Sequence, residues 1–253
     1  MPKNQTYRIP AVTNMSCVPT TLEAATDQAK VATKSAIQAG LTRLQVEMVI
    51  PELKHQPIAE QFLELFSDLG LRFKVYFPDA GAAALARRDW GEPDFSIRGI
   101  NEIQGQPNPD DDAFLVVNPS SVEVSDVEKL CGVALDRPVI LLNPQLEDVA
   151  TVGIGYAARQ LRERFLSQLE SCYYLRPLDG AVILRSYPQS WQIWKAVDLD
   201  DETSYTLLTE LPQRPSSEAI DRLLYGDKPN TDSSQPKRSV FAELQQFLRA
   251  LMQ

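Results

Sequence analysis

The feature that most constrains the fold is an alternation of short apolar segments with amphipathic helical segments. Four segments have the length and apolar content of buried strands: 43–50, 73–77, 114–117 and 139–142. Helical periodicity fills the segments around them: 22–37, 58–69, 80–88, 122–130 and 155–169. Thr20 and Glu23 have capping-box spacing and predict where the first helix begins. The alternation favours a mostly parallel sheet with helices on both faces, Rossmann-like or flavodoxin-like.

The first of these strands has one polar face. Apolar residues occupy its alternate positions: Leu44, Val46, Met48 and Ile50. Gln45 and Glu47 stand between them, and side chains alternate across a strand. We therefore expect this strand to have a wetter side.

The predicted secondary structure changes after residue 171, from alternating strands and helices to consecutive strands. Four β-rich segments follow at 172–175, 181–187, 192–197 and 205–211. Asp179 and Gly180 separate the first two and are a strong hairpin signal. We expect an antiparallel meander that extends the same sheet or packs on its edge, followed by a helix over 217–224.

The chain is predicted to have three parts: a single α/β domain over 1–225, a polar linker over 226–239, and an amphipathic helix over 240–253. Apolar residues recur on one face of that helix: Phe241, Leu244, Phe247, Leu248 and Leu251. This stripe needs a surface to bury against. Two alternatives stay open: the helix folds back on its own domain, or it binds a partner.

Charge and composition exclude several classes of function. Acidic residues exceed basic ones by nine, and without a basic stripe we expect no nucleic-acid binding. The first twelve residues lack the apolar core of a signal peptide, and no apolar run approaches the ~20 residues of a membrane span. Peripheral contact with a membrane surface stays open. Three widely separated cysteines are typical of reduced thiols, so we expect a cytoplasmic protein.

Each of the four predicted parallel strands runs directly into a proline, at positions 51, 78, 119 and 144. Proline ends a buried strand because it has no N–H for the ladder. The carboxyl ends of parallel strands share one edge, where open α/β sheets bind ligands. The polar residues near these ends therefore define a candidate crevice: Glu52, Asp79, Asn118, Ser120, Ser121, Asn143, Glu147 and Asp148, with Arg159 nearby. Alternatively, residues such as Asp79, Ser120 and Ser121 only cap the helices that follow.

Two further motifs are weak as phosphate sites. Arg87 and Arg88 lie about 11 Å along the helix that Asp79 would begin, too far to assist an anion at its start. The glycine motif at 153–158 matches a dinucleotide fingerprint as a string. However, about ten residues separate it from the preceding strand, whereas the fingerprint requires it to follow the strand directly.

No catalytic motif is present, so the sequence favours a protein that is not an enzyme. We expect no cofactor and no metal. His55 is the single histidine, and its polar neighbours place it in an exposed loop. A site that uses only carboxylates for acid–base chemistry stays open.

Four strings together resemble a known family: FPDAGAAALARRDW at 77–90, NPQLED at 143–148, GIGYAARQLR at 153–162 and CYYLRP at 172–177. They are similar to the uncharacterised domain of unknown function nineteen ninety-five of cyanobacteria and plastids, over about residues 19–225. Some plastid members of that family are named for low accumulation of photosystem II. The resemblance implies a photosynthetic setting, in a cyanobacterial cytosol or the equivalent plastid stroma, and carries over no catalytic residues.

We therefore expect a soluble accessory or assembly factor that interacts with subunits of photosynthetic complexes. The alternative is a small-molecule-binding domain, for a nucleotide or phosphate among others, or an enzyme that uses the crevice. A closed crevice with an exposed apolar patch favours the first. An open pocket with converging carboxylates favours the second.

Overall fold

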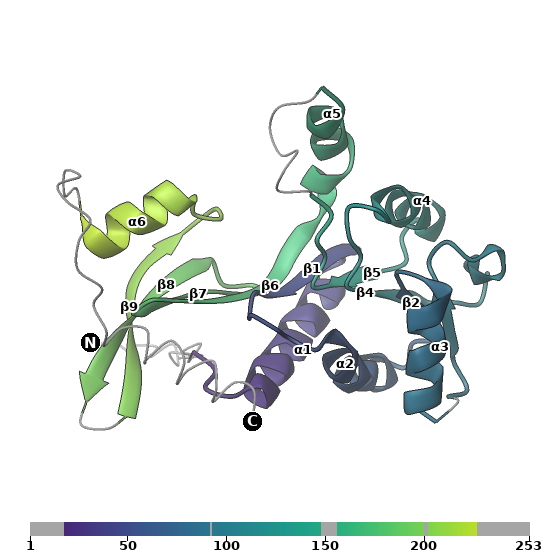
Figure 1. Cartoon of the computed structure of the whole chain (residues 1–253), viewed down its shortest axis with the longest axis horizontal. Helices are drawn as coiled ribbons and strands as arrows, with labels where there is room; N and C mark the ends of the chain where they lie inside the picture. The colour runs from purple at the N-terminus through teal and green to yellow at the C-terminus, as the bar shows by residue number, and fades with distance from the viewer. Residues whose placement is uncertain (1–17, 92, 148–155, 200–201, 227–253) are drawn as a thin grey trace, which may run out of the picture.

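A computed structural model describes residues 18–91, 93–147, 156–199 and 202–226. These residues form one nine-stranded sheet in the order β3-β2-β4-β5-β1-β6-β7-β8-β9 (Figure 1). The predicted linker and C-terminal helix at 226–253 lie outside the described residues, apart from Gly226.

The first six strands run parallel to one another. Their bounds are β1 Arg43–Met48, β2 Phe73–Phe77, β3 Ser96–Gly99, β4 Ala113–Val117, β5 Val139–Leu142 and β6 Glu170–Leu178. Strands β4 and β5 are buried at every position because helices cover both of their faces. The prolines that follow β1, β2, β4 and β5 therefore lie along one carboxyl edge, as predicted.

Helices lie on both faces of the sheet (Figure 1). On one face lie α1 Leu22–Gln38, α2 His55–Leu69 and α3 Ala80–Asp89; on the other lie α4 Val124–Ala134, α5 Tyr156–Arg164 and α6 Ser217–Tyr225. The contact face of α1 is made largely of fully buried alanines, whose small size lets the helix sit close to the sheet. Helix α2 ends at Gly70, whose φ of 65° closes the helix in the left-handed region.

The meander extends the same sheet. Strands β7 Ala181–Ser186, β8 Trp191–Leu199 and β9 Glu202–Leu211 follow β6 as antiparallel neighbours. Gly180 has a φ of 67° in the β6–β7 turn, as the Asp-Gly signal predicted. The predicted fold class, a mostly parallel α/β sheet with a C-terminal antiparallel meander, is confirmed.

Three local predictions need correction. Strand β3 was not predicted; it is short and carries Arg98, so it lacks a clear apolar run. Thr21 rather than Thr20 caps α1, its side chain accepting a hydrogen bond from the Ala24 N–H at 3.1 Å. The helix predicted over 155–169 is shorter, because a separate 3-10 turn at Leu166–Gln168 follows α5.

Candidate functional site

The hydrophobic core is continuous on one face of the sheet and divided on the other. Helices α1, α2 and α3 pack over one large cluster. On the opposite face, α4 and α5 cover one cluster and α6 covers another. Between them lies an open cleft of about 1630 Å³, which we call the β1 groove. Residues from five stretches of the chain line it: Gln45, Glu47, Met48, Val49, Ile50, Pro51, Glu52, Leu53, His55, Asn143, Pro144, Gln145, Leu146, Glu147, Arg162, Leu166, Ser167, Arg176, Pro177, Leu178, Asp179, Gln213 and Arg214.

The polar face of β1 forms part of this groove. Apolar side chains of β1 lie buried in the large cluster, whereas Gln45 and Glu47 point to the other face and line the groove. The wetter side predicted from sequence is thus confirmed. A polar face on a central parallel strand is unusual, because such strands are normally covered on both sides.

Glu47 is the most buried carboxylate among the ion pairs of the groove, with its side chain 14 % exposed. Arg214 approaches it at 3.3 Å and the Ser171 hydroxyl at 3.4 Å. Burial raises the pKa of the Glu47 carboxyl, and Arg214 and Ser171 offset part of that rise. Both contacts are long, so this carboxylate retains capacity to accept further hydrogen bonds.

Arg214, from the connection between β9 and α6, forms one wall of the groove. Its guanidinium lies 4.3 Å from the ring centre of Tyr174 and 5.7 Å from that of Trp191. The two rings are themselves 5.1 Å apart. This stacking holds Arg214 over the sheet while it reaches Glu47.

The opposite wall comes from α5 and the 3-10 turn. There Arg162 pairs with Glu147 at 2.9 Å. Arg176, at the end of β6, also lines the groove and has no ion pair with any described residue. The groove therefore combines carboxylates, guanidinium groups and apolar residues along its length.

His55 lies where α2 begins, at the end of the groove that is next to the carboxyl ends of β1 and β5, which we call the carboxyl end of the groove. Its Nδ1 is 3.1 Å from the side-chain nitrogen of Asn143, whose side-chain oxygen accepts the Met48 N–H at 2.6 Å. Because that bond fixes the Asn143 amide, the amide N–H donates to Nδ1 and places the imidazole proton on Nε2. Burial lowers the pKa of His55. The prediction that His55 is simply exposed in a loop was wrong.

Backbone strain gathers at the same edge. Glu52, Asn118 and Asn143 have φ values of 57°, 47° and 48°, in the left-handed region that non-glycine residues seldom occupy. They follow β1, β4 and β5 directly or within a few residues. Strained backbone of this kind often accompanies functional sites, because the surrounding structure must hold it.

Asn118 and Asn143 follow neighbouring strands at equivalent positions, but only Asn143 binds a backbone N–H. The Asn143 N–H donates to the Val46 carbonyl and the Asn118 N–H to the Leu142 carbonyl. Two residues beyond these acceptors stand Met48 and Pro144, which are therefore at equivalent positions. Because proline has no N–H, the buried side-chain oxygen of Asn118 has no partner among the described residues.

The structure divides the predicted crevice residues. Glu52, Asn143 and Glu147 line the β1 groove. Asp79 instead caps α3 by accepting the Ala82 N–H at 2.9 Å, and Ser120 forms hydrogen bonds with Glu123 and Val122. Ser121 is half-buried and Arg159 is exposed on α5, and neither lines the groove. Asp148 lies outside the described residues. For Asp79 the capping alternative is confirmed, whereas Ser120 makes its contacts in the turn before α4, whose N-cap position is Glu123.

The arginines after Asp79 also make local contacts. Arg87 donates to the Ile97 carbonyl at 2.8 Å, and Arg88 pairs with Asp89 at 2.7 Å. Both lie in the last turn of α3, where cations favour the helix dipole. The glycines of the motif at 153–158 lie outside the described residues.

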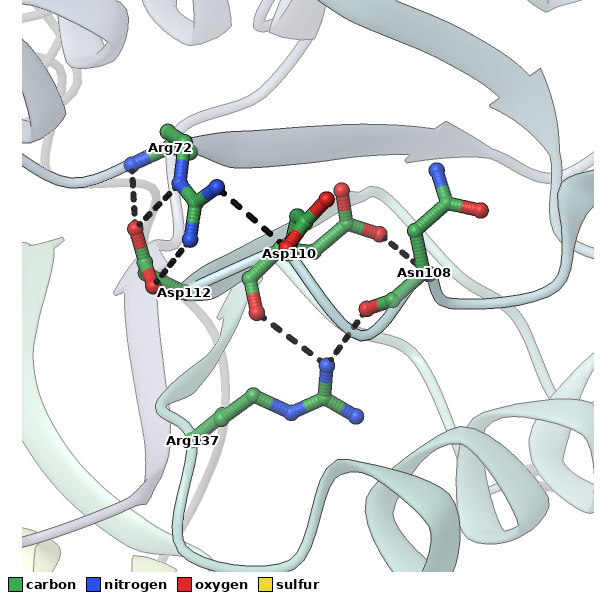
Figure 2. Close-up of polar contacts among 6 residues, drawn as sticks. Arg72, Asn108, Asp110, Asp112 and Arg137 are labelled. Atoms are coloured by element: carbon green, nitrogen blue, oxygen red, sulfur yellow. Dashed lines mark hydrogen bonds and ion pairs between the residues drawn. The ribbon is translucent and has the colours of Figure 1, made fainter.

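A second concentration of carboxylates, in the loop before β4, is paired with basic side chains of the protein (Figure 2). Arg72 pairs with Asp112 at 3.1 Å and Asp110 at 3.6 Å, and Arg137 donates to the Asn108 carbonyl at 2.8 Å. Asp111, the third carboxylate of this loop, pairs with the buried Lys74. These contacts fasten the loop to the sheet and leave its charges engaged within the protein.

Within the described ranges, no group of three or more histidine, cysteine, aspartate or glutamate side chains is placed to hold a metal ion. Nor does any helix in those ranges have the length and apolar character needed to cross a membrane. The β1 groove can bind a ligand through charge, hydrogen bonds and apolar contact.

No solved structure matches the chain significantly. The family described as "Domain of unknown function (DUF1995)" matches residues 19–222, close to the extent expected from the sequence motifs. Since that match covers most of the chain, the protein belongs to the DUF1995 family.

Proposed function

We propose that the protein is a protein-interaction module that binds an extended polypeptide segment of a partner in the β1 groove. The observation that carries this proposal is the uncovered polar face of β1, a central strand of the sheet. Covering that face with a helix would bury apolar area, as it does over β4 and β5. The sequence instead keeps Gln45 and Glu47 there, which suits a surface that a partner covers.

The size and lining of the groove support a polypeptide occupant. Small-molecule sites usually enclose about 300–1000 Å³. The groove is larger, at about 1630 Å³, and open. Its lining alternates apolar residues such as Leu146 and Leu166 with charged ones such as Arg176, as a peptide with mixed side chains requires.

Selection of peptides from a random display library against the full chain tests this proposal. Ser167→Trp narrows the groove from its exposed wall, and Ser125→Trp places the same side chain on the exposed surface of α4, away from the groove. We expect selected peptides to bind the parent and Ser125→Trp equally and Ser167→Trp at least about tenfold more weakly, a loss of about 1.4 kcal/mol. Failure to select any peptide, or equal binding to all three proteins, would contradict the proposal.

A second candidate function, small-molecule binding, is favoured by the residues at the carboxyl end of the groove. His55 is held by Asn143 with its Nε2–H available as a donor, and the backbone around it is strained. A metabolite bound there would be recovered with the protein on purification from its native cell and identified by mass spectrometry. Loss of that metabolite in His55→Gln would assign it to this end of the groove.

The identity of the partner is a separate proposal. The resemblance of the sequence motifs to a cyanobacterial and plastid family supports a subunit of a photosynthetic complex, met in the cytosol or stroma. Affinity purification of the full chain from its native cell, with Ser167→Trp as the control, tests it. Photosynthetic subunits should be recovered with the parent and depleted with the variant.

A further inference from the structure

We propose that Glu47 makes the β1 groove selective for a basic side chain, lysine or arginine, of the bound polypeptide segment. This inference rests on the proposed function and names the chemistry of its partner. Glu47 contributes a carboxylate to the groove from the centre of the sheet, on a strand whose neighbouring side chains Val46 and Met48 are buried on the other face.

The contacts of Glu47 leave room for a second cation. Arg214 and Ser171 reach it at 3.3 and 3.4 Å, longer than the 2.7–2.9 Å of a strong charge-assisted hydrogen bond. By contrast, the exposed pair of Arg162 and Glu147 on the opposite wall closes to 2.9 Å. A carboxylate offers about four lone-pair positions, so an incoming ammonium or guanidinium can bind beside Arg214 or replace it.

Charge complementarity points to the same occupant. The chain carries a net charge of −9, which attracts basic segments and repels acidic ones over long range. Within the groove, four carboxylates stand against three guanidinium groups: Glu47, Glu52, Glu147 and Asp179 against Arg162, Arg176 and Arg214. Apolar residues such as Leu166 and Leu178 lie along the same groove and suit the aliphatic stem of a long basic side chain.

A purely structural role for the ion pair is the rival explanation, in which Arg214 and Glu47 only fasten the β9–α6 connection to the sheet. The two explanations differ in the effect of removing each partner. If Glu47 reads a basic side chain, Arg214 competes with that side chain, and its loss leaves the preference intact or increases it. If the pair is only structural, the two substitutions act alike.

The test uses two probes that differ only in the terminal ammonium group, Nα-acetyl-lysine methylamide and Nα-acetyl-norleucine methylamide. Each is titrated into the full chain and followed by amide chemical shifts, with thermal unfolding as a check that each variant is folded. We expect saturable binding of the lysine probe, about tenfold or more tighter than the norleucine probe. Glu47→Gln should abolish this preference, and Arg214→Gln should retain or increase it.

Three results would overturn the proposal: equal binding or no saturable binding of the two probes to the parent, a preference that survives Glu47→Gln, or a preference lost in both variants. None of these results decides whether the groove binds a polypeptide. Peptide selection with Ser167→Trp decides that question, and selected peptides without basic residues would leave the proposed function standing while removing Glu47 as its selector.

Discussion

Asn143 and Asn118 end neighbouring strands in the same left-handed conformation, but only Asn143 finds a backbone N–H for its side-chain oxygen. The N–H comes from Met48, at 2.6 Å, and the equivalent position beside Asn118 is Pro144. Two asparagines in the same backbone conformation therefore differ in their side-chain contacts: the Asn143 oxygen accepts a hydrogen bond, and the Asn118 oxygen has no partner among the described residues. Asn143 joins β5 to β1 and to α2, at the carboxyl end of the groove.

This relationship predicts unequal losses of stability. Asn143→Ala leaves the buried Met48 N–H without a partner, whereas Asn118→Ala removes an oxygen that has none among the described residues. The strain of alanine at positive φ is common to both variants. We expect Asn143→Ala to lower the free energy of unfolding by about 1–3 kcal/mol more than Asn118→Ala. Urea unfolding measures the difference, and equal losses would contradict the assignment of the Met48 bond.

The single histidine allows a direct test of the His55 environment. Burial lowers its pKa in the folded state, below the unfolded value of about 6.5. As pH falls, the unfolded chain therefore binds its proton first. The stabilising contribution of neutral His55 is present above pH ~6.5 and is lost as pH falls from there towards the folded pKa.

Nitrogen NMR of the one imidazole gives both the pKa and the tautomer, without assignment from other histidines. We expect a titration midpoint below 6.5 with the proton on Nε2, and a smaller stability loss below pH 6.5 in His55→Gln. A midpoint at or above the unfolded value would contradict the burial of the ring, and a proton on Nδ1 would show that Asn143 does not donate to it.

Two buried cysteines test the packing on both faces of the sheet. Cys131 lies in α4 and Cys172 in β6, and burial raises their pKa values to about 11 and about 12. The thiols stay protonated at neutral pH, and the thiolate is the reactive form. We expect both to resist iodoacetamide in the native protein and to react fully in urea, as peptide mass spectrometry would show. Rapid native alkylation of Cys172 would mean that α1 does not cover β6 as described.

Strands β1, β2, β4 and β5, the meander and the polar face of β1 could be predicted because each is a local pattern. Alternating Gln45 and Glu47 within an apolar strand show which residues face away from the core. The pattern does not show what lies opposite, because Arg214 is far along the chain and reaches Glu47 only through the folded meander. A polar face on a strand expected to be buried in a parallel sheet was the signal that could have located the groove.

His55 shows the converse limit. Its neighbours Lys54 and Gln56 have polar side chains that are usually exposed, and they therefore indicate an exposed loop. The partner that half-buries it, Asn143, is contributed by a different strand, so no local pattern reveals the contact. Asp79, in contrast, was correctly weighed as a capping residue, since capping depends only on residues within one turn.

The most direct test of the account is to map where a selected peptide binds. Amide chemical shifts of the full chain, recorded with and without the peptide, locate the contact surface. We predict the largest changes on the floor and walls of the β1 groove, at Gln45 and Glu47, at Arg176 and at Arg214. Changes confined to the opposite face, over α1, α2 and α3, would contradict the claim that the uncovered face of β1 is the binding surface.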